Sequence, residues 1–165
     1  MINVRKGVFE TNSSSTHAIV IAKEGTEIFD QIDFRIGEFG WEHEIYATPE
    51  EKASYIYTLA CNLYDRDVAD EISDLLSPYG INCTFSLRPI FEEYSGGKML
   101  DNGWVDHCTE GEDLANDLLS DSALLIDFLF NGESYVETGN DNEEYERPVG
   151  NRIPKGKYVE YYKGN

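Results

Sequence analysis

Ala18-Ile19-Val20-Ile21-Ala22 is the apolar run on which the expected fold depends. It is short, it contains three β-branched residues, and a polar stretch precedes it. Runs of this kind are typical of strands that lie buried in a sheet. We therefore predict a buried strand at residues 18–22, with the partner strands and covering helices supplied by the rest of the chain.

The clearest helix signal is Thr48-Pro49-Glu50-Glu51. Thr48 suits the N-cap, Pro49 suits the first turn because its missing N–H costs nothing there, and Glu51 completes a capping box. We predict a helix from this point to about Tyr64. Its apolar face is expected to comprise Ile56, Leu59, Ala60 and Leu63.

A second helix is predicted from about Asp67 to a stop at Pro78-Tyr79-Gly80, and a strand is predicted at residues 81–87. The residues expected to be buried on this helix are Val68, Ile72, Leu75 and Leu76. Two other segments are weakly patterned. Residues 26–46 are expected to form a loop with at most one short strand, and the Gly-rich residues 92–108 are expected to be irregular.

Thr109-Glu110-Gly111-Glu112 is another capping-box pattern and predicts a helix through Leu118 or Leu119. Residues 122–130 are apolar and fit a helix that Ser120 caps and that ends at Asn131-Gly132. As a strand, the same segment would form a hairpin through Asn-Gly into residues 134–138. We favour the helix, and we predict a last strand at residues 157–162.

Strands and helices that mix without a regular βαβ rhythm favour an α+β fold. A length of 165 residues suits one domain. We therefore predict a single compact α+β domain over residues 1–165, with a small mixed or antiparallel sheet packed by three to four helices.

The cysteines and the lengths of the apolar segments indicate the cellular compartment in which the protein is expected. Cys61, Cys83 and Cys108 are odd in number and form no CxxC pair, which favours reduced thiols over disulfides or a zinc site. No apolar run has the length of a signal peptide or a membrane span. We expect a soluble protein of the cytoplasm of a host cell, without a cofactor or a membrane contact.

Charge is the strongest compositional signal. Thirteen basic and 32 acidic side chains give a net charge of −19. Such a field repels nucleic acid and anionic lipid and attracts basic surfaces, so we expect a basic protein partner and no direct binding of nucleic acid. Solubility alone is the competing explanation.

The charge is unevenly distributed along the chain. Residues 1–25 carry a net charge of +1 and residues 147–165 carry +4, which leaves −24 on residues 26–146. The two ends of a domain often lie close together. If these two do, they form a surface that tolerates an anion.

The stretch Phe9-Glu10-Thr11-Asn12-Ser13-Ser14-Ser15-Thr16-His17 leads directly into the predicted strand. Small polar residues favour turns, so one interpretation is a polar loop. The other is an anion or nucleotide cradle, in which hydroxyl and turn N–H groups converge on an oxyanion and His17 acts as acid or base.

This stretch also resembles the opening of a family of uncharacterised proteins from phages and bacterial mobile elements, in which a basic residue precedes Phe-Glu-Thr-Asn-Ser-Ser-Ser-Thr-His. The likeness covers residues 5–17 and extends more loosely to Val105-Asp106-His107 and to residues 135–142. It implies an origin rather than an activity. It is also a reason to consider the three segments together.

Together the three segments contain the residue types of a site. One arrangement is a catalytic set of Ser13, Ser14 or Ser15 with His17 or His107 and Asp141. Another is a hard-metal site made by Glu10, Asp106, His107 and Asp141. The residues expected to bind the ligand are Arg5, Asn12, Thr16, Asn140 and Asn142. Ordinary loop and turn roles compete with both arrangements.

Two function classes follow. The first is a small acidic phage-type accessory protein that binds and modulates a basic, nucleic-acid-handling host factor, for example as an anti-defence inhibitor. The second is an enzyme or small-ligand binder that uses the Asn-Ser-Ser-Ser-Thr-His loop with His107 and Asp141 on an anionic substrate. Smaller signals, such as Glu42-His43-Glu44, are interpreted as solvated charged faces.

Overall fold

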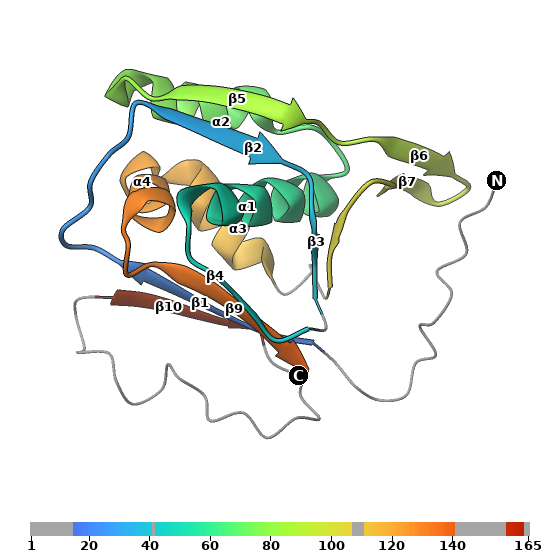
Figure 1. The fold of residues 1–165 in the computed structure, drawn as a ribbon. Helices are drawn as coiled ribbons and strands as arrows, with labels where there is room; N and C mark the ends of the chain where they lie inside the picture. Colours follow the sequence, from blue (N-terminus) through green and yellow to red (C-terminus); the bar gives the residue numbers. More distant parts are fainter. Residues whose placement is uncertain (1–14, 41, 107–110, 141–157, 164–165) are drawn as a thin grey trace.

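β1 (Ser15–Ala22) is an inner strand of a four-stranded antiparallel sheet with the order β10-β1-β9-β4 (Figure 1). Its partners are β4 (Glu44–Tyr46), β9 (Tyr135–Asn140) and β10 (Tyr158–Lys163). The computed structural model describes residues 15–40, 42–106, 111–140 and 158–163.

The predicted strand at residues 18–22 is confirmed and is longer than expected. It begins at Ser15, so Thr16 and His17 belong to the strand and not to a loop. The cause is long-range pairing with β9, whose register runs from Ser15 opposite Asn140 to Val20 opposite Tyr135. Backbone hydrogen bonds with a distant strand override the local turn preference of serine and threonine.

α1 (Pro49–Tyr64) begins as predicted. The Glu51 amide donates to Thr48 Oγ1 (3.3 Å), and the Thr48 amide donates to Glu51 Oε2 (3.0 Å), which completes the capping box. The prediction of one apolar face is too narrow, because Tyr55 and Tyr57 are fully buried as well. The helix lies between the four-stranded sheet and the β2–β5 pair, so opposite sides of it are covered (Figure 1).

The expectation of a loop at residues 26–46 is wrong. This segment contains β2 (Gln31–Arg35), β3 (Glu38–Phe39) and β4. β2 pairs in parallel with β5 (Asn82–Leu87), and β3 pairs in parallel with β8 (Trp104–Val105). β3 and β4 are too short to show a periodicity and are defined by partners far away in the sequence, whereas β2 does alternate, with Ile32 and Phe34 buried.

Residues 92–108 are also more regular than predicted. β6 (Phe91–Tyr94) and β7 (Gly97–Leu100) form an antiparallel hairpin that extends away from the helices (Figure 1). Beyond it, Gly103 lies so close to Ile36 and to the backbone of Gly37 that any Cβ at this position would clash. This close approach allows β8 to pair with β3.

α2 (Ala69–Leu76) is followed by a 3-10 turn, η1 (Ser77–Tyr79). Gly80 then adopts a left-handed conformation with φ of +75°, which confirms the predicted stop. Of the residues expected to be buried here, Leu75 is only partly buried.

α3 (Glu112–Ser120) and α4 (Ser122–Phe130) are two separate helices, and the helical interpretation of residues 122–130 is confirmed. The residue that caps α4 is Asp121 and not Ser120, because Asp121 Oδ1 accepts from the amides of Ala123 (2.9 Å) and Leu124 (3.1 Å). Thr109 and Glu110 lie outside the described residues. The N-cap residue of α3 is Gly111, which has no side-chain cap.

The architecture is a mixed α+β domain, as predicted. Its core lies around α1, between the inner face of the four-stranded sheet and the β2–β5 pair, and α2, α3 and α4 pack against it. Within the described part of the chain, no helix has the length and apolar character needed to cross a bilayer. The largest fully buried aromatic and aliphatic residues are Phe34, Tyr55, Tyr57, Phe128, Ile19, Ile21, Ile32, Ile56, Leu59 and Ile72.

Candidate functional site

The structure describes only part of the predicted site. Ser15, Thr16, His17, Asp106 and Asn140 belong to described elements or directly follow one. The remaining candidates lie outside the described residues: Arg5, Glu10, Asn12, Ser13, Ser14, His107, Asp141 and Asn142.

The strand pairing brings together two of the three segments that resemble the phage and mobile-element proteins. In the β1–β9 register, Ser15 lies opposite Asn140 and His17 lies opposite Thr138. The third segment approaches through β3, because the Asp106 amide donates to the Phe39 carbonyl at 2.9 Å. These segments therefore lie in one region of the fold, although Ser15 is 91 residues from Asp106 and 125 residues from Asn140 in the sequence.

His17 points toward the core and not toward solvent. It is fully buried, and its Nδ1 lies 2.8 Å from Tyr55 Oη on α1. The Tyr55 ring packs edge-on against Phe39, with a centroid distance of 5.2 Å. Alternate residues of a strand share one face, so Ser15, His17 and Ile19 all face α1.

Ser15 is a buried polar residue whose hydroxyl needs a hydrogen-bond partner. The residue is 2% exposed, and among the described residues its Oγ has no hydrogen-bond partner. Burial of an unsatisfied hydroxyl costs free energy, so the position favours a bound polar group. The Ser15 hydroxyl can donate a hydrogen bond to such a group or accept one from it.

His43 pairs with a carboxylate that sequence reasoning missed. Its Nε2 lies 2.8 Å from Glu137 Oε1, although 94 residues separate the two. Glu137 is only 8% exposed, and its Oε2 is buried without a hydrogen-bond partner among the described residues. In the sequence Glu137 looks like an ordinary polar residue of an alternating strand, and no local signal marks its burial.

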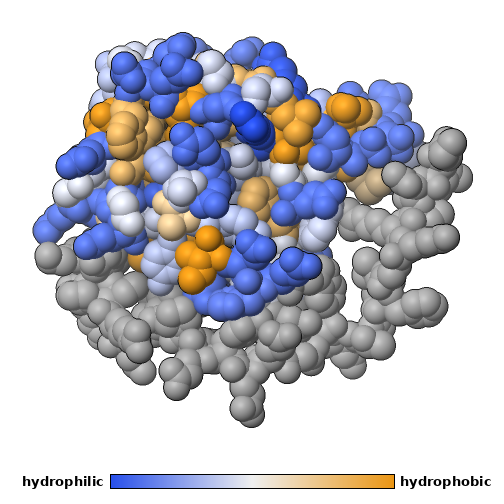
Figure 2. All heavy atoms as spheres, in the orientation of Figure 1, coloured by the Kyte–Doolittle hydropathy of each residue, from blue (hydrophilic) through white to orange (hydrophobic). Residues whose placement is uncertain are grey.

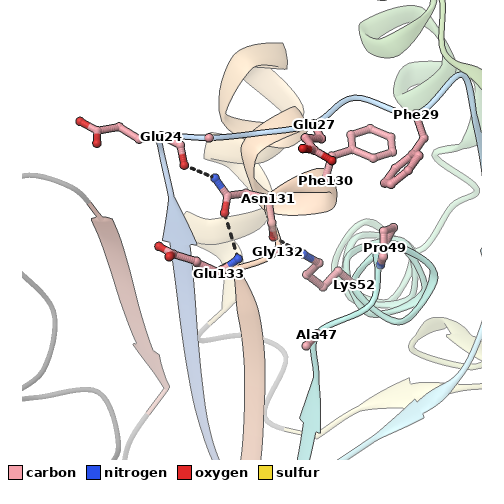
Figure 3. Close-up of a pocket in the computed structure, with 11 residues that line it drawn as sticks. Glu24, Glu27, Phe29, Ala47, Pro49, Lys52, Phe130, Asn131, Gly132 and Glu133 are labelled. Carbon is pink, nitrogen blue, oxygen red and sulfur yellow. Dashed lines mark hydrogen bonds between the residues drawn. The ribbon is translucent and has the colours of Figure 1, made fainter.

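A cavity of about 470 Å³ lies where the N-terminus of α1 meets the C-terminus of α4 (Figure 3). Its walls combine the aromatic rings of Phe29 and Phe130, whose centroids are 5.9 Å apart, with Pro49 and Ala47. Glu27 lies beside the two rings (Figure 3). The sequence predicted no site here, because its lining comes from three separate segments, at residues 24–29, 47–52 and 130–133.

Lys52 forms the buried polar wall of this cavity. Its Nζ donates to the carbonyl oxygens of Asn131 (2.8 Å) and Ser134 (3.0 Å), directly after α4 ends. A cation at the C-terminal end of a helix is stabilised by the helix dipole. Burial nevertheless lowers the pKa of Lys52 from 10.5 to about 8.

Asn131 joins three segments around the same cavity, because its carbonyl also accepts from Lys52. Its Nδ2 donates to the Glu24 carbonyl (2.9 Å) and to Thr26 Oγ1 (3.0 Å), and its Oδ1 accepts from the Glu133 amide (2.9 Å). These bonds hold the β1–β2 connection against the end of α4 (Figure 3). The predicted helix end at Asn131-Gly132 is confirmed, and it also supports the cavity wall.

The thiols and carboxylates of the described residues do not form a metal site. No group of three or more His, Cys, Asp or Glu side chains within the described ranges is placed to hold an ion. Cys61 and Cys83 are free, and burial raises the pKa of these thiols to about 12 and about 11, so both are protonated at neutral pH. They are unsuited to nucleophilic chemistry.

A second electrostatic feature surrounds Tyr64 at the end of α1. Its Oη donates to Asn116 Oδ1 on α3 at 2.5 Å. Burial is the main cause that raises the pKa of the Tyr64 phenol, and the charges of Glu112 on α3 and Glu71 on α2 raise it further. Carboxylates of two helices therefore converge on one surface.

The face of the molecule drawn in Figure 2 is mostly hydrophilic, and its hydrophobic residues form small separate groups. Among the described residues, the surface of converging carboxylates, the 470 Å³ cavity and the buried polar residues around His17 are features on which a function can rest. No protein-family model, curated protein or solved structure matches this chain.

Proposed function

We propose that this chain binds a basic surface on a nucleic-acid-handling protein of a host cell and modulates that protein. The observation that supports the proposal is the convergence of exposed carboxylates from α2 and α3. We call this surface the α2–α3 acidic face. Its exposed residues are Asp70, Glu71, Asp74, Glu112, Asp113 and Asp117.

The two helices are held together, so the acidic face is a defined surface. The Tyr64–Asn116 hydrogen bond ties α1 to α3, and buried Ile72 and Leu76 of α2 and Leu118 of α3 belong to the same core. The carboxylates therefore project from a rigid base. Carboxylates on a rigid base lose less conformational entropy when a partner binds than carboxylates on a flexible segment do.

On the described surface, the arginine side chains form ion pairs with carboxylates. Arg66 pairs with Glu71, Arg35 with Asp33 at 2.7 Å, and Arg88 with Asp67 at 2.9 Å. Each pair neutralises one carboxylate and leaves its neighbours uncompensated. The resulting field is negative, attracts basic surfaces and weakens as salt is added.

The class of partner that we propose follows from the kind of protein surface that binds an array of negative charges. Proteins that handle nucleic acid carry lysine and arginine clusters spaced to contact successive phosphates. A rigid face of carboxylates is suited to the same clusters. The resemblance of residues 5–17 to phage and mobile-element proteins supports a partner in a bacterial host, including a defence protein.

The test is a comparison of two charge-matched variants in a pull-down from host lysate. The face variant carries Asp70→Asn, Asp74→Asn, Glu112→Gln and Asp113→Asn. The control variant removes the same number of charges elsewhere, by Glu38→Gln, Glu92→Gln, Glu93→Gln and Asp101→Asn. We expect the wild type and the control to retain a basic protein at low salt, and the face variant to lose it.

Competition then identifies the surface that the partner uses. Duplex DNA added in excess should release the captured protein, because the acidic face and the phosphates would occupy one site. Equal retention by the face variant and the wild type would contradict the proposal. So would the recovery of no basic partner at low salt.

A small-ligand site at Ser15 is the second candidate function. Two observations favour this candidate: Ser15 Oγ is buried and has no hydrogen-bond partner within the described part of the chain, and Asn140 lies opposite Ser15 in the strand register. An anionic ligand such as inorganic phosphate should raise the melting temperature of the wild type and not that of Ser15→Ala. An equal response of the two proteins would exclude Ser15 from any such site.

A further inference from the structure

We propose that the outer face of the β4–β9 pair, together with the adjoining cavity, binds an extended lysine- or arginine-bearing segment of the basic partner, with Glu137 as the contact for one cationic side chain. We call this surface the β4–β9 groove. The proposal rests on the proposed function and names a second contact surface, separate from the α2–α3 acidic face.

The groove is continuous. A shallow depression of about 280 Å³ is lined by Ile45, Ala47 and Tyr135 together with Gly132 and Glu133. Ala47, Gly132 and Glu133 also line the 470 Å³ cavity that contains Phe29 and Phe130. The two depressions therefore share a border and form one path from the sheet surface to the aromatic pair.

The path is apolar, and it is exposed at both ends. Ile45 is 54% exposed and Phe29 is 52% exposed. Large apolar side chains this accessible, placed on either side of a hollow, are typical of surfaces that bind another chain. Between them lie Pro49 and Ala47, which are small and leave the hollow open.

Glu137 lies on the same face of the sheet as this path. In the antiparallel register, Ile45 is directly opposite Glu137, so their side chains share a face and their Cβ atoms are about 5 Å apart. Tyr135 is two residues before Glu137 and projects from the same face. Ala18 is the register partner of Glu137 on the other side.

The carboxylate of Glu137 is only half satisfied. His43 occupies Oε1, while Oε2 is buried and has no hydrogen-bond partner among the described residues. A buried carboxylate oxygen in this state is costly, and a cationic donor is its strongest partner. This observation is independent of the apolar path and indicates a ligand with a positive charge.

The charges around the groove select the same ligand. Glu24, Glu27 and Glu133 line it, while the one lysine of the lining, Lys52, directs its Nζ to two backbone carbonyls. An occupant that alternates apolar and basic side chains meets both requirements.

The experiment measures the fluorescence anisotropy of a labelled peptide that alternates leucine and arginine, titrated with the full-length protein at low salt. Ile45→Lys adds a repelling charge to the groove, and Glu137→Gln removes the anionic contact without a change of shape. We expect each substitution to weaken binding by about tenfold or more.

Ile90→Lys is the matched control, because Ile90 is 56% exposed and lies next to the β6–β7 hairpin. The affinity of the Ile90→Lys variant for the peptide should equal that of the wild type. Circular dichroism establishes that each variant is folded, and the exposed Ile45 keeps the test decisive even if Glu137→Gln proves unstable.

Two outcomes overturn the groove. One is equal affinity of Ile45→Lys and the wild type, and the other is equal affinity for a peptide in which glutamate replaces arginine. Neither outcome tests the proposed function, which is tested by the variants of the α2–α3 acidic face. Conversely, peptide binding that depends on Ile45 would stand even if the variant of the acidic face retained its partner.

Discussion

Several buried polar side chains of this protein have partners far away in the sequence. His17 contacts Tyr55, Lys52 bonds to carbonyls that are 79 and 82 residues away, and Glu137 pairs with His43. A buried polar group is tolerated when it is hydrogen-bonded, so each pairing ties two segments of chain together. These residues therefore specify how the elements dock.

The His17–Tyr55 contact allows a direct test. Tyr55→Phe removes the buried hydroxyl and leaves His17 Nδ1 without this bond, which should lower the free energy of unfolding by about 1–2 kcal/mol. Tyr79→Phe is the control, because it deletes a hydroxyl from an exposed bond of 3.1 Å with Ser122. Its effect should remain within about 0.5 kcal/mol in urea unfolding.

Lys52 makes stability depend on pH in the alkaline range. Its pKa is about 8 in the folded chain and near 10.5 when unfolded, so between these values the unfolded state binds more protons. Stability due to this residue therefore rises with pH from about 8 to about 10.5.

Urea unfolding of the wild type and of Lys52→Met across this range measures the effect, because the difference between them cancels the shared tyrosine titrations. The wild type should gain stability relative to Lys52→Met as pH rises. A difference that stays constant with pH would contradict the assignment.

At the scale of elements, the helix ends follow local rules while the short strands do not. Thr48-Pro49-Glu50-Glu51 starts α1 by contacts within one turn, and these can be predicted from four letters. β3 and β4 were missed because they have two and three residues, which is too little periodicity to indicate a strand. β2 has five residues that alternate between exposed and covered positions, and its place in the fold is set by pairing with the distant β5.

The cap of α4 is a prediction at this scale. Asp121→Ala removes two hydrogen bonds to the first turn and should cost about 1 kcal/mol of stability. Ser120→Ala should cost much less, because the Ser120 hydroxyl donates back to the Asp117 carbonyl at 3.2 Å. A thermal unfolding series of the two variants decides which residue is the cap, and equal losses would refute the assignment to Asp121.

At the scale of the whole molecule, the net charge of −19 opposes compaction. The described ends of the chain pair directly, since β1 lies beside β10 with His17 opposite Lys163. The described parts of the two less acidic end segments therefore lie side by side, which is the condition set above for a surface that tolerates an anion. Most of the carboxylates remain on the helical and loop surfaces.

Self-repulsion predicts a salt effect on stability. Added sodium chloride screens the repulsion among carboxylates, so the melting temperature should rise from low to moderate ionic strength. Calorimetry at constant pH measures the shift. A melting temperature that falls with salt would mean that ion pairs such as Arg88–Asp67 outweigh the repulsion.

Local features of the chain were enough to predict the α+β class, the buried strand at residues 18–22, both ends of α1 and the helix at residues 122–130. Each depends on side-chain periodicity or on capping within one turn. The positions of His17 in the core, Lys52 in a cavity wall and Glu137 beside Ile45 could not be predicted. They follow from the docking of segments about 40 to 110 residues apart, and no local pattern encodes such contacts.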